Sequence, residues 1–167
     1  MWQRLTISLR SYRITLAVIF VAWVLYCLWL WQPARQVRKH QEHFIAAVGT
    51  RNWSRVEEFI DARYSDRWGH DKTFVLRESR EVFRQFFALS IQSDVTSCAI
   101  SGDAGMVTAK LKIAGTGTAI AEYAKEAVNG LGEPFVFEWT RRSWLPWDWK
   151  LMRVDQPQLR LDHGNEF

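Results

Sequence analysis

The sequence has few cysteines: Cys27 and Cys98 are the only two in 167 residues. They lie far apart, and Cys27 falls inside an apolar run, where a thiol behaves as a small hydrophobic side chain. Two such cysteines exclude a disulfide framework. There is also no CxxC motif and no cluster of His and Cys with the spacing of a zinc site, so we expect neither a metal nor a cofactor.

The common motifs of catalysis are absent too. The chain has no GxSxG, no glycine-rich phosphate loop and no pair of carboxylates at a suitable spacing, because the adjacent Glu57 and Glu58 cannot share one face of a helix. The net charge of +4 arises from 22 basic and 18 acidic residues, a balance that excludes a nucleic-acid-binding stripe. Much of the surplus lies close to a hydrophobic run, which favours a protein next to a membrane.

That run is ITLAVIFVAWVLYCLWLW, from Ile14 to Trp31, without a charge and with Thr15 as its only clearly polar residue. At about 1.5 Å per residue, a helix of roughly 18 residues nearly spans the core of a bilayer. The run ends in tryptophans and not in small residues, which argues against a cleaved signal peptide. We therefore predict a transmembrane anchor over residues 14–32, the alternative being a helix buried in a core.

The orientation of this anchor depends on the charges at its two ends. The basic residues are Arg4, Arg10 and Arg13 before the run, and Arg35, Arg38 and Lys39 after it. These numbers are nearly tied under the positive-inside rule. We favour a short cytoplasmic N-terminus of residues 1–13 and a periplasmic or extracytoplasmic C-terminal domain, as is common when an uncleaved N-terminal anchor precedes a long domain.

The rest of the chain is long enough for one domain with its own core. Apolar residues at helical spacing predict helices over residues 33–49, 53–62 and 72–88, the second capped by Asn52 and the third by Asp71. Alternating apolar residues then predict strands. The pattern predicts a first hairpin over residues 91–100 and 106–115, and a second hairpin over residues 133–142 and 147–155. Between them, residues 119–128 are expected to form a short helix or an irregular strand. A flexible tail is expected over residues 158–167.

The predicted fold class is therefore α+β: an N-terminal transmembrane helix, then a domain over residues 33–157 with about three helices packed on a curved antiparallel sheet. Two segments, NWSRVEEFIDARYSDRWGHDK and the closing WDWKLMRVDQP, resemble the nuclear transport factor 2-like superfamily. The resemblance covers about Arg35 to Pro157 and implies a cone-shaped domain. The superfamily includes isomerases, dehydratases, cyclases, noncatalytic binding proteins and membrane-anchored secretion scaffolds, so the fold does not decide the function.

Enzymes of this superfamily typically place an Asp, His or Tyr inside the cone as a base or an oxyanion donor. The candidates that this resemblance implies are Tyr64, Asp66, His70 and Tyr123. Asp66 and His70 belong to the DRWGH loop before the third helix, where they could reach the mouth of the cone. The alternative role for Asp66 is to hold a turn in which Gly69 adopts an unusual backbone angle.

Four tryptophans lie in the stretch FEWTRRSWLPWDWK. Strand parity places Trp139, Trp147 and Trp149 on the face of the sheet that meets the helices, which predicts an aromatic wall of the core. The alternative is a pocket for a small apolar ligand, lined by Phe87, Phe137, Trp139 and Trp149. Trp144 differs, because it lies in the turn beside Arg141 and Arg142, where it could contact a lipid headgroup, a glycan or a partner protein.

We therefore expect a membrane-tethered noncatalytic binding or assembly module of the bacterial cell envelope. The alternatives are an isomerase, dehydratase or cyclase-type enzyme that uses a polar residue in the cone, and an oligomeric scaffold of the secretion type. The expected partners are the membrane, through Ile14 to Trp31, and either a protein or a small apolar ligand. A homodimer is a further alternative, and no nucleic acid is expected.

Overall fold

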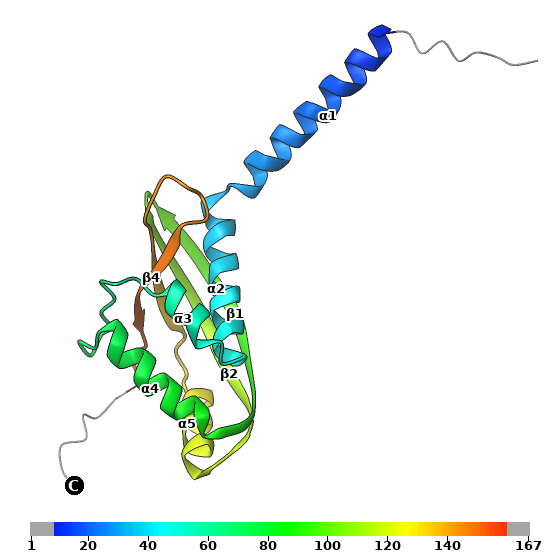
Figure 1. Ribbon diagram of the computed structural model, residues 1–167. Coiled ribbons are helices and arrows are strands. Elements are labelled where there is room, and N and C mark those ends of the chain that lie inside the picture. Colours follow the sequence, from blue (N-terminus) through cyan, green and yellow to red (C-terminus); the bar gives the residue numbers. More distant parts are fainter. Residues whose placement is uncertain (1–8, 160–167) are drawn as a thin grey trace, which may run out of the picture. The chain divides into compact units, whose positions relative to one another are not determined.

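A computed structural model describes the backbone of residues 9–159 and the side chains of residues 12–27 and 31–159. Residues 1–8 of the predicted cytoplasmic segment and 160–167 of the predicted tail lie outside the described residues. The chain divides into two compact units, one that ends at Gln32 and one that begins at Pro33 (Figure 1). The described residues form five helices and four strands, which confirms the α+β class.

Helix α1, Leu9–Leu30, belongs to the first unit. It contains most of the apolar run, and most of its described side chains are exposed, among them Ile19, Phe20 and Trp23 at 59 to 62%. In the part of the chain that the structure describes, no helix combines the length and the apolarity needed to cross a membrane.

The second unit contains four described helices and one antiparallel sheet. The helices are α2 (Pro33–Gly49), α3 (Trp53–Phe59), α4 (Lys72–Arg84) and α5 (Ala119–Asn129). The strands are β1 (Phe86–Ser101), β2 (Ala104–Gly117), β3 (Phe135–Arg141) and β4 (Trp149–Asp155). They pair in the order β1-β2-β3-β4, and Figure 1 shows α2 lying along the long hairpin of β1 and β2.

Local sequence signals account for where these elements begin. The side chain of Asn52 accepts a hydrogen bond from the backbone N–H of Arg55, and that of Asp71 accepts one from Phe74 at 2.8 Å, so both predicted helix caps are confirmed. The segment at 119–128, for which the sequence left two alternatives, is the helix α5.

The sheet is bent by irregularities in its pairing. The register shifts between Phe86 and Ala88 and between Val95 and Ser97 in β1, and between Glu138 and Trp139 in β3. Such bulges bend a strand and increase its twist, which gives the sheet the curvature that the resemblance implies. Gly115 of β2 pairs with Leu89, next to the first of these sites, and has φ +145°. A Cβ there would be 2.0 Å from the carbonyl oxygen of Ala88.

The core lies between α2, α3 and one face of the sheet. Its buried members include Val37, Phe44, Val56 and Phe59 from the helical side, and Val107, Phe137, Trp139, Trp149 and Leu151 from the strands. Burial alternates along β3, where every second side chain from Phe135 to Trp139 is buried. The parity prediction for Trp139 and Trp149 is therefore confirmed.

Among the predicted boundaries that differ from the structure, two concern aromatic residues that the sequence placed in the wrong element. The third helix ends at Arg84 and not near Ala88, because Phe86 already pairs with Gly117 in the sheet and packs against Ile113 and Ala121. This shift places Phe87 on β1, where 78% of it is exposed.

The other boundary is the start of the last strand, which begins at Trp149 and not at Trp147. A turn precedes it, in which the backbone N–H of Asp148 donates to the carbonyl oxygen of Leu145. Trp147 therefore lies outside the alternation of the strand and is 54% exposed, so its predicted place in the aromatic wall is wrong.

Candidate functional site

Aromatic rings from three parts of the chain occupy the middle of the core. Phe44, Phe59 and Trp139 contact one another edge to face, with ring centroids between 6.1 and 6.4 Å apart. Trp139 and Trp149 are each 1% exposed, and Phe137 is 2% exposed. Three of the four residues predicted to line an apolar pocket are thus brought together, but they pack against the chain's own rings.

The remaining pocket candidate and one catalytic candidate lie on the surface. Phe87 is 78% exposed near the start of β1, and Tyr123 is 75% exposed on α5. The structure does not bring either of them into the core with Trp139.

A polar pair lies inside this aromatic core. Gln41 is fully buried, and its Oε1 accepts a hydrogen bond of 3.1 Å from Nε1 of Trp139, whereas its Nε2 has no hydrogen-bond partner among the described residues. His40 is next to it on α2, with Nδ1 2.8 Å from the carbonyl oxygen of Gln36. Burial lowers the pKa of His40 and outweighs the carbonyls of Gln36 and Trp147, which raise it.

The DRWGH loop is held by Asp66. Its Oδ1 accepts hydrogen bonds from the backbone N–H groups of Trp68 and His70 at 2.9 and 2.8 Å, and its Oδ2 lies 2.9 Å from Nδ1 of His70. Gly69 completes the turn with φ +84°. The His70 ring stacks on Phe74 with centroids 4.1 Å apart. The structure thus brings Asp66 and His70 together in a turn, in which both oxygens of the carboxylate already have partners.

Tyr64 is buried near this loop. Burial raises the pKa of its phenol, and the charge of Asp66 adds to the rise, while the backbone of Val154 opposes it. A phenol with a raised pKa remains protonated at neutral pH and is a poor general base. Within the described residues, no group of three or more His, Cys, Asp or Glu side chains converges as metal ligands would.

Asp61 is a buried charged residue that the sequence analysis did not single out. Its side chain is 0% exposed, and Oδ1 accepts a hydrogen bond of 2.8 Å from the backbone N–H of Arg63. Nε of Arg142 lies 2.7 Å from Oδ2 and forms an ion pair without the alignment of a hydrogen bond. No local pattern marks this residue, because Arg142 comes from a distant loop.

That loop connects β3 to β4, and its tip carries the predicted surface residues. Trp144 is 81% exposed. Arg141 and Arg142 are engaged in ion pairs, the former with Asp103 through Nε at 2.9 Å and the latter with Asp61. Arg141 is the last residue of β3, and Arg142 and Trp144 follow it in the loop, so the structure brings the three residues together and both guanidinium groups hold the loop to the domain.

Hydrogen bonds fix the backbone of this loop. The carbonyl oxygen of Pro146 accepts from Nε1 of the buried Trp149 at 2.9 Å, and the N–H of Arg142 donates to the carbonyl oxygen of Asp148 at 2.9 Å. The exposed ring of Trp144 is thus carried by an anchored turn.

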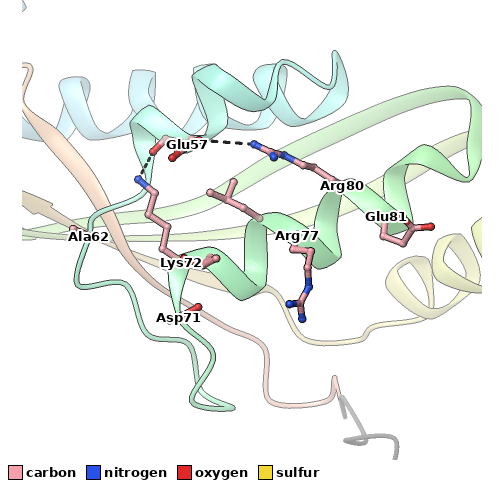
Figure 2. Close-up of a pocket in the computed structure, with 9 residues that line it drawn as sticks. Glu57, Ala62, Asp71, Lys72, Arg77, Arg80 and Glu81 are labelled. Atoms are coloured by element: carbon pink, nitrogen blue, oxygen red, sulfur yellow. Dashed lines mark hydrogen bonds and ion pairs between the residues drawn. The ribbon is translucent and has the colours of Figure 1, made fainter.

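A surface groove of about 790 Å³ lies between α3 and α4 (Figure 2). Nζ of Lys72 donates to the carbonyl oxygens of Glu57 at 2.8 Å and Ile60 at 3.0 Å, and so caps the end of α3. Figure 2 shows Lys72 and Arg80 both directed at Glu57, whereas Arg77 points away from it. The charged groups of this groove join the two helices and do not converge on one position for a ligand.

No protein-family model matches this chain, and none of the curated proteins is similar to it in sequence. Solved structures do match it. A conserved protein from Planctomyces limnophilus has a TM-score of 0.56 at 12% identity, over 72% of this chain and 91% of that one. A proposed dehydratase from the NTF2-like family, from Streptomyces avermitilis, has a TM-score of 0.53 at 18% identity, over 72% and 91%. The CaMKII hub of S. rosetta has a TM-score of 0.50 at 13% identity, over 74% and 94%.

At such identities the likeness shows the fold alone. The chain has a nuclear transport factor 2-like fold, as the resemblance in its sequence predicted. The same fold is found in a proposed dehydratase and in a hub, so it leaves the function open.

Proposed function

We propose that this domain with a nuclear transport factor 2-like fold is a membrane-tethered binding or assembly module of the bacterial cell envelope and is not an enzyme. The run from Ile14 to Trp31 holds it to the bilayer, with residues 1–13 in the cytoplasm and the domain on the periplasmic or extracytoplasmic side. The tether and the absence of catalysis rest on separate observations, and the side of the membrane follows from the expected orientation of an N-terminal anchor.

The tether is supported by α1. The described side chains from Tyr12 to Tyr26 remain largely exposed, although most of them are apolar. Apolar surface in water costs roughly 25 cal/mol per Å², so a helix of this composition favours a bilayer or another protein around it. The tryptophans at the end of the run suit the interface between the acyl chains and the headgroups.

The absence of catalysis is supported by the filled core, and this is the observation that carries the proposal. An enzyme of the alternative class needs an open cavity with a polar group at its base. Here Phe44, Phe59 and Trp139 occupy the middle of the core, and both oxygens of Asp66 hold a turn.

A second candidate function is the oligomeric scaffold. The well exposed large apolar side chains of the second unit include, besides the two tryptophans of the β3–β4 loop, Phe87 at 78%, Ile120 at 58% and Tyr123 at 75%. Exposed apolar side chains of this size are typical of surfaces that contact another protein chain.

Membrane fractionation of the full chain tests the tether. We expect the chain to remain in the membrane after alkaline carbonate extraction, and a variant with Val18→Lys and Val21→Lys to be released, because charges in an apolar span disfavour insertion. The matched control carries Val18→Leu and Val21→Leu. Release of the unaltered chain by carbonate would contradict the tether, and digestion of the domain in intact spheroplasts tests the side on which it lies.

Native mass spectrometry of the detergent-released chain tests the absence of a ligand cavity and the alternative of an oligomeric scaffold. We expect no retained small molecule, because the core is filled. A stoichiometric small ligand would contradict a noncatalytic module with a closed core, whereas a repeated homomultimer would favour the scaffold.

A further inference from the structure

Two exposed tryptophans mark one end of the second unit. Trp144 and Trp147 of the loop between β3 and β4 are 81% and 54% exposed, whereas Trp139 and Trp149 in the flanking strands are 1% exposed. We call the first pair the tip patch, and we consider with it Arg38 and Lys39, two exposed cations in the second turn of α2. Hydrogen bonds anchor the backbone of this loop, so the two exposed indoles are attached to an ordered turn.

The loop lies beside the beginning of α2. The backbone carbonyl of Trp147 faces the ring of His40, in the second turn of that helix, and raises its pKa. On the other side, the N–H of Arg141 donates to the carbonyl oxygen of Asp103 at 2.8 Å, which joins the loop to the turn between β1 and β2. Figure 1 shows the loop next to the first turns of α2.

The short covalent link between the apolar run and α2 limits how far this end of the second unit can lie from the run. The apolar run ends at Trp31, and α2 begins at Pro33. Two residues span at most about 7 Å, whatever the direction of α1. If the run lies in a membrane, the first turns of α2, and the loop beside them, lie close to the surface of that membrane.

The side chains of the tip patch have the chemistry of such a surface. Indoles partition to the layer of the headgroups, where the ring is in an apolar environment and the N–H meets water. Arg38 and Lys39 are exposed on α2, whereas Arg141 and Arg142 are paired with acidic residues. Exposed cations next to a bilayer favour anionic headgroups.

We propose that the tip patch is a second membrane contact, in which Trp144 and Trp147 enter the headgroup layer of the bilayer that holds α1, and Arg38 and Lys39 face anionic lipids. This inference rests on the proposed tether and adds to it. The contact limits the rotation of the domain about its linker, and so holds the rest of its surface toward the surrounding compartment.

Hydroxyl-radical footprinting of the full chain tests the contact without a label. The chain is reconstituted in vesicles of phosphatidylcholine, with or without phosphatidylglycerol, and oxidation of Trp144, Trp147 and Tyr123 is measured by peptide mass spectrometry. We expect the oxidation of Trp144 relative to Tyr123 to fall severalfold when phosphatidylglycerol is present. The variant Arg38→Gln with Lys39→Gln should lose most of this protection, whereas the matched control Lys110→Gln, on the exposed side of β2, should keep it.

Flotation of the same vesicles separates the two hypotheses. If the chain floats with the vesicles but Trp144 remains as reactive as Tyr123 in both lipid mixtures, the proposed contact is wrong and the tether stands. A tip patch that binds a glycan or a protein partner would give this result. Equal protection in neutral vesicles would contradict the role of Arg38 and Lys39. A chain that does not float would overturn the tether and the contact together.

Discussion

Nε1 of Trp139 donates a hydrogen bond to Oε1 of Gln41 over 3.1 Å, and neither side chain is more than 1% exposed. The bond joins β3 to α2 across the core and fixes the orientation of the indole that Phe44 and Phe59 contact. A buried indole N–H usually has an acceptor, since leaving it unpaired is costly.

A double-mutant cycle measures this bond. We expect Trp139→Phe to lower the free energy of unfolding by about 2–4 kcal/mol, through a cavity and an unpaired amide. Gln41→Leu should cost about 1–3 kcal/mol, through an unpaired indole N–H. The double variant should lose about 1 kcal/mol less than the sum of the two. Chemical denaturation of the full chain, followed by near-UV circular dichroism, checks this, and strictly additive losses would show that the two groups are not coupled.

Asp61 should contribute to stability far more than an exposed carboxylate. Asp61→Asn removes a buried charge that faces Arg142, and we expect a loss of about 1–3 kcal/mol. The matched control is Asp155→Asn, since Asp155 pairs with Arg67 at 3.5 Å in a more exposed position, and here we expect less than about 0.5 kcal/mol. Equal losses in thermal unfolding of the two variants would be inconsistent with a structural role for the buried pair.

Gly115→Ala should be strongly destabilising. The residue has φ +145°, and the new methyl group would lie 2.0 Å from the carbonyl oxygen of Ala88, so the start of the β1 and β2 pairing must open. We expect a loss of about 2–4 kcal/mol. Gly132→Ala is the control, since its Cβ would meet only the side chain of Gln158 at 3.6 Å. The same denaturation curves compare the two, and an unaffected Gly115→Ala variant would refute the close approach.

His40 should make stability depend on pH. Burial lowers its pKa in the folded chain below the usual value of about 6.5, so the unfolded chain binds a proton more readily. The stability that this difference contributes is complete above about pH 6.5 and is lost as the pH falls through the folded pKa. His43 and Lys150, which also face the ring, act in the same direction as burial.

His40→Gln tests this dependence. Between about pH 7.5 and about pH 5.5, the unaltered chain should lose more free energy of unfolding than the variant, because only its folded state resists protonation at this position. The exposed His43 provides the comparison: His43→Gln should reduce the loss less than His40→Gln does, because the charge of His43 lowers the pKa of His40 less than burial does. Identical pH dependence of the unaltered chain and His40→Gln would contradict the buried imidazole.

Local patterns in the sequence were sufficient for most of the elements. Helical spacing, the caps Asn52 and Asp71, and the alternation around Trp139 depend on neighbours within a few residues, and all of them appear in the structure. The same patterns failed at Phe86 and Trp147, where an element ends because of pairing or a turn and not because its apolar period stops. When the alternation of a strand is applied to residues beyond its ends, it assigns their side chains to the wrong face of the sheet.

By itself, the sequence determined the α+β class, the apolar run before Pro33 and the aromatic face of the last hairpin, because each of these is a periodic or compositional property of neighbouring residues. Only the tertiary structure decided that the rings of the cone pack against one another, that Asp61 is buried beside Arg142, and that Trp147 is exposed with Trp144. These properties depend on which distant segments cover a side chain, and that is set by the register of the sheet and by the path of its loops.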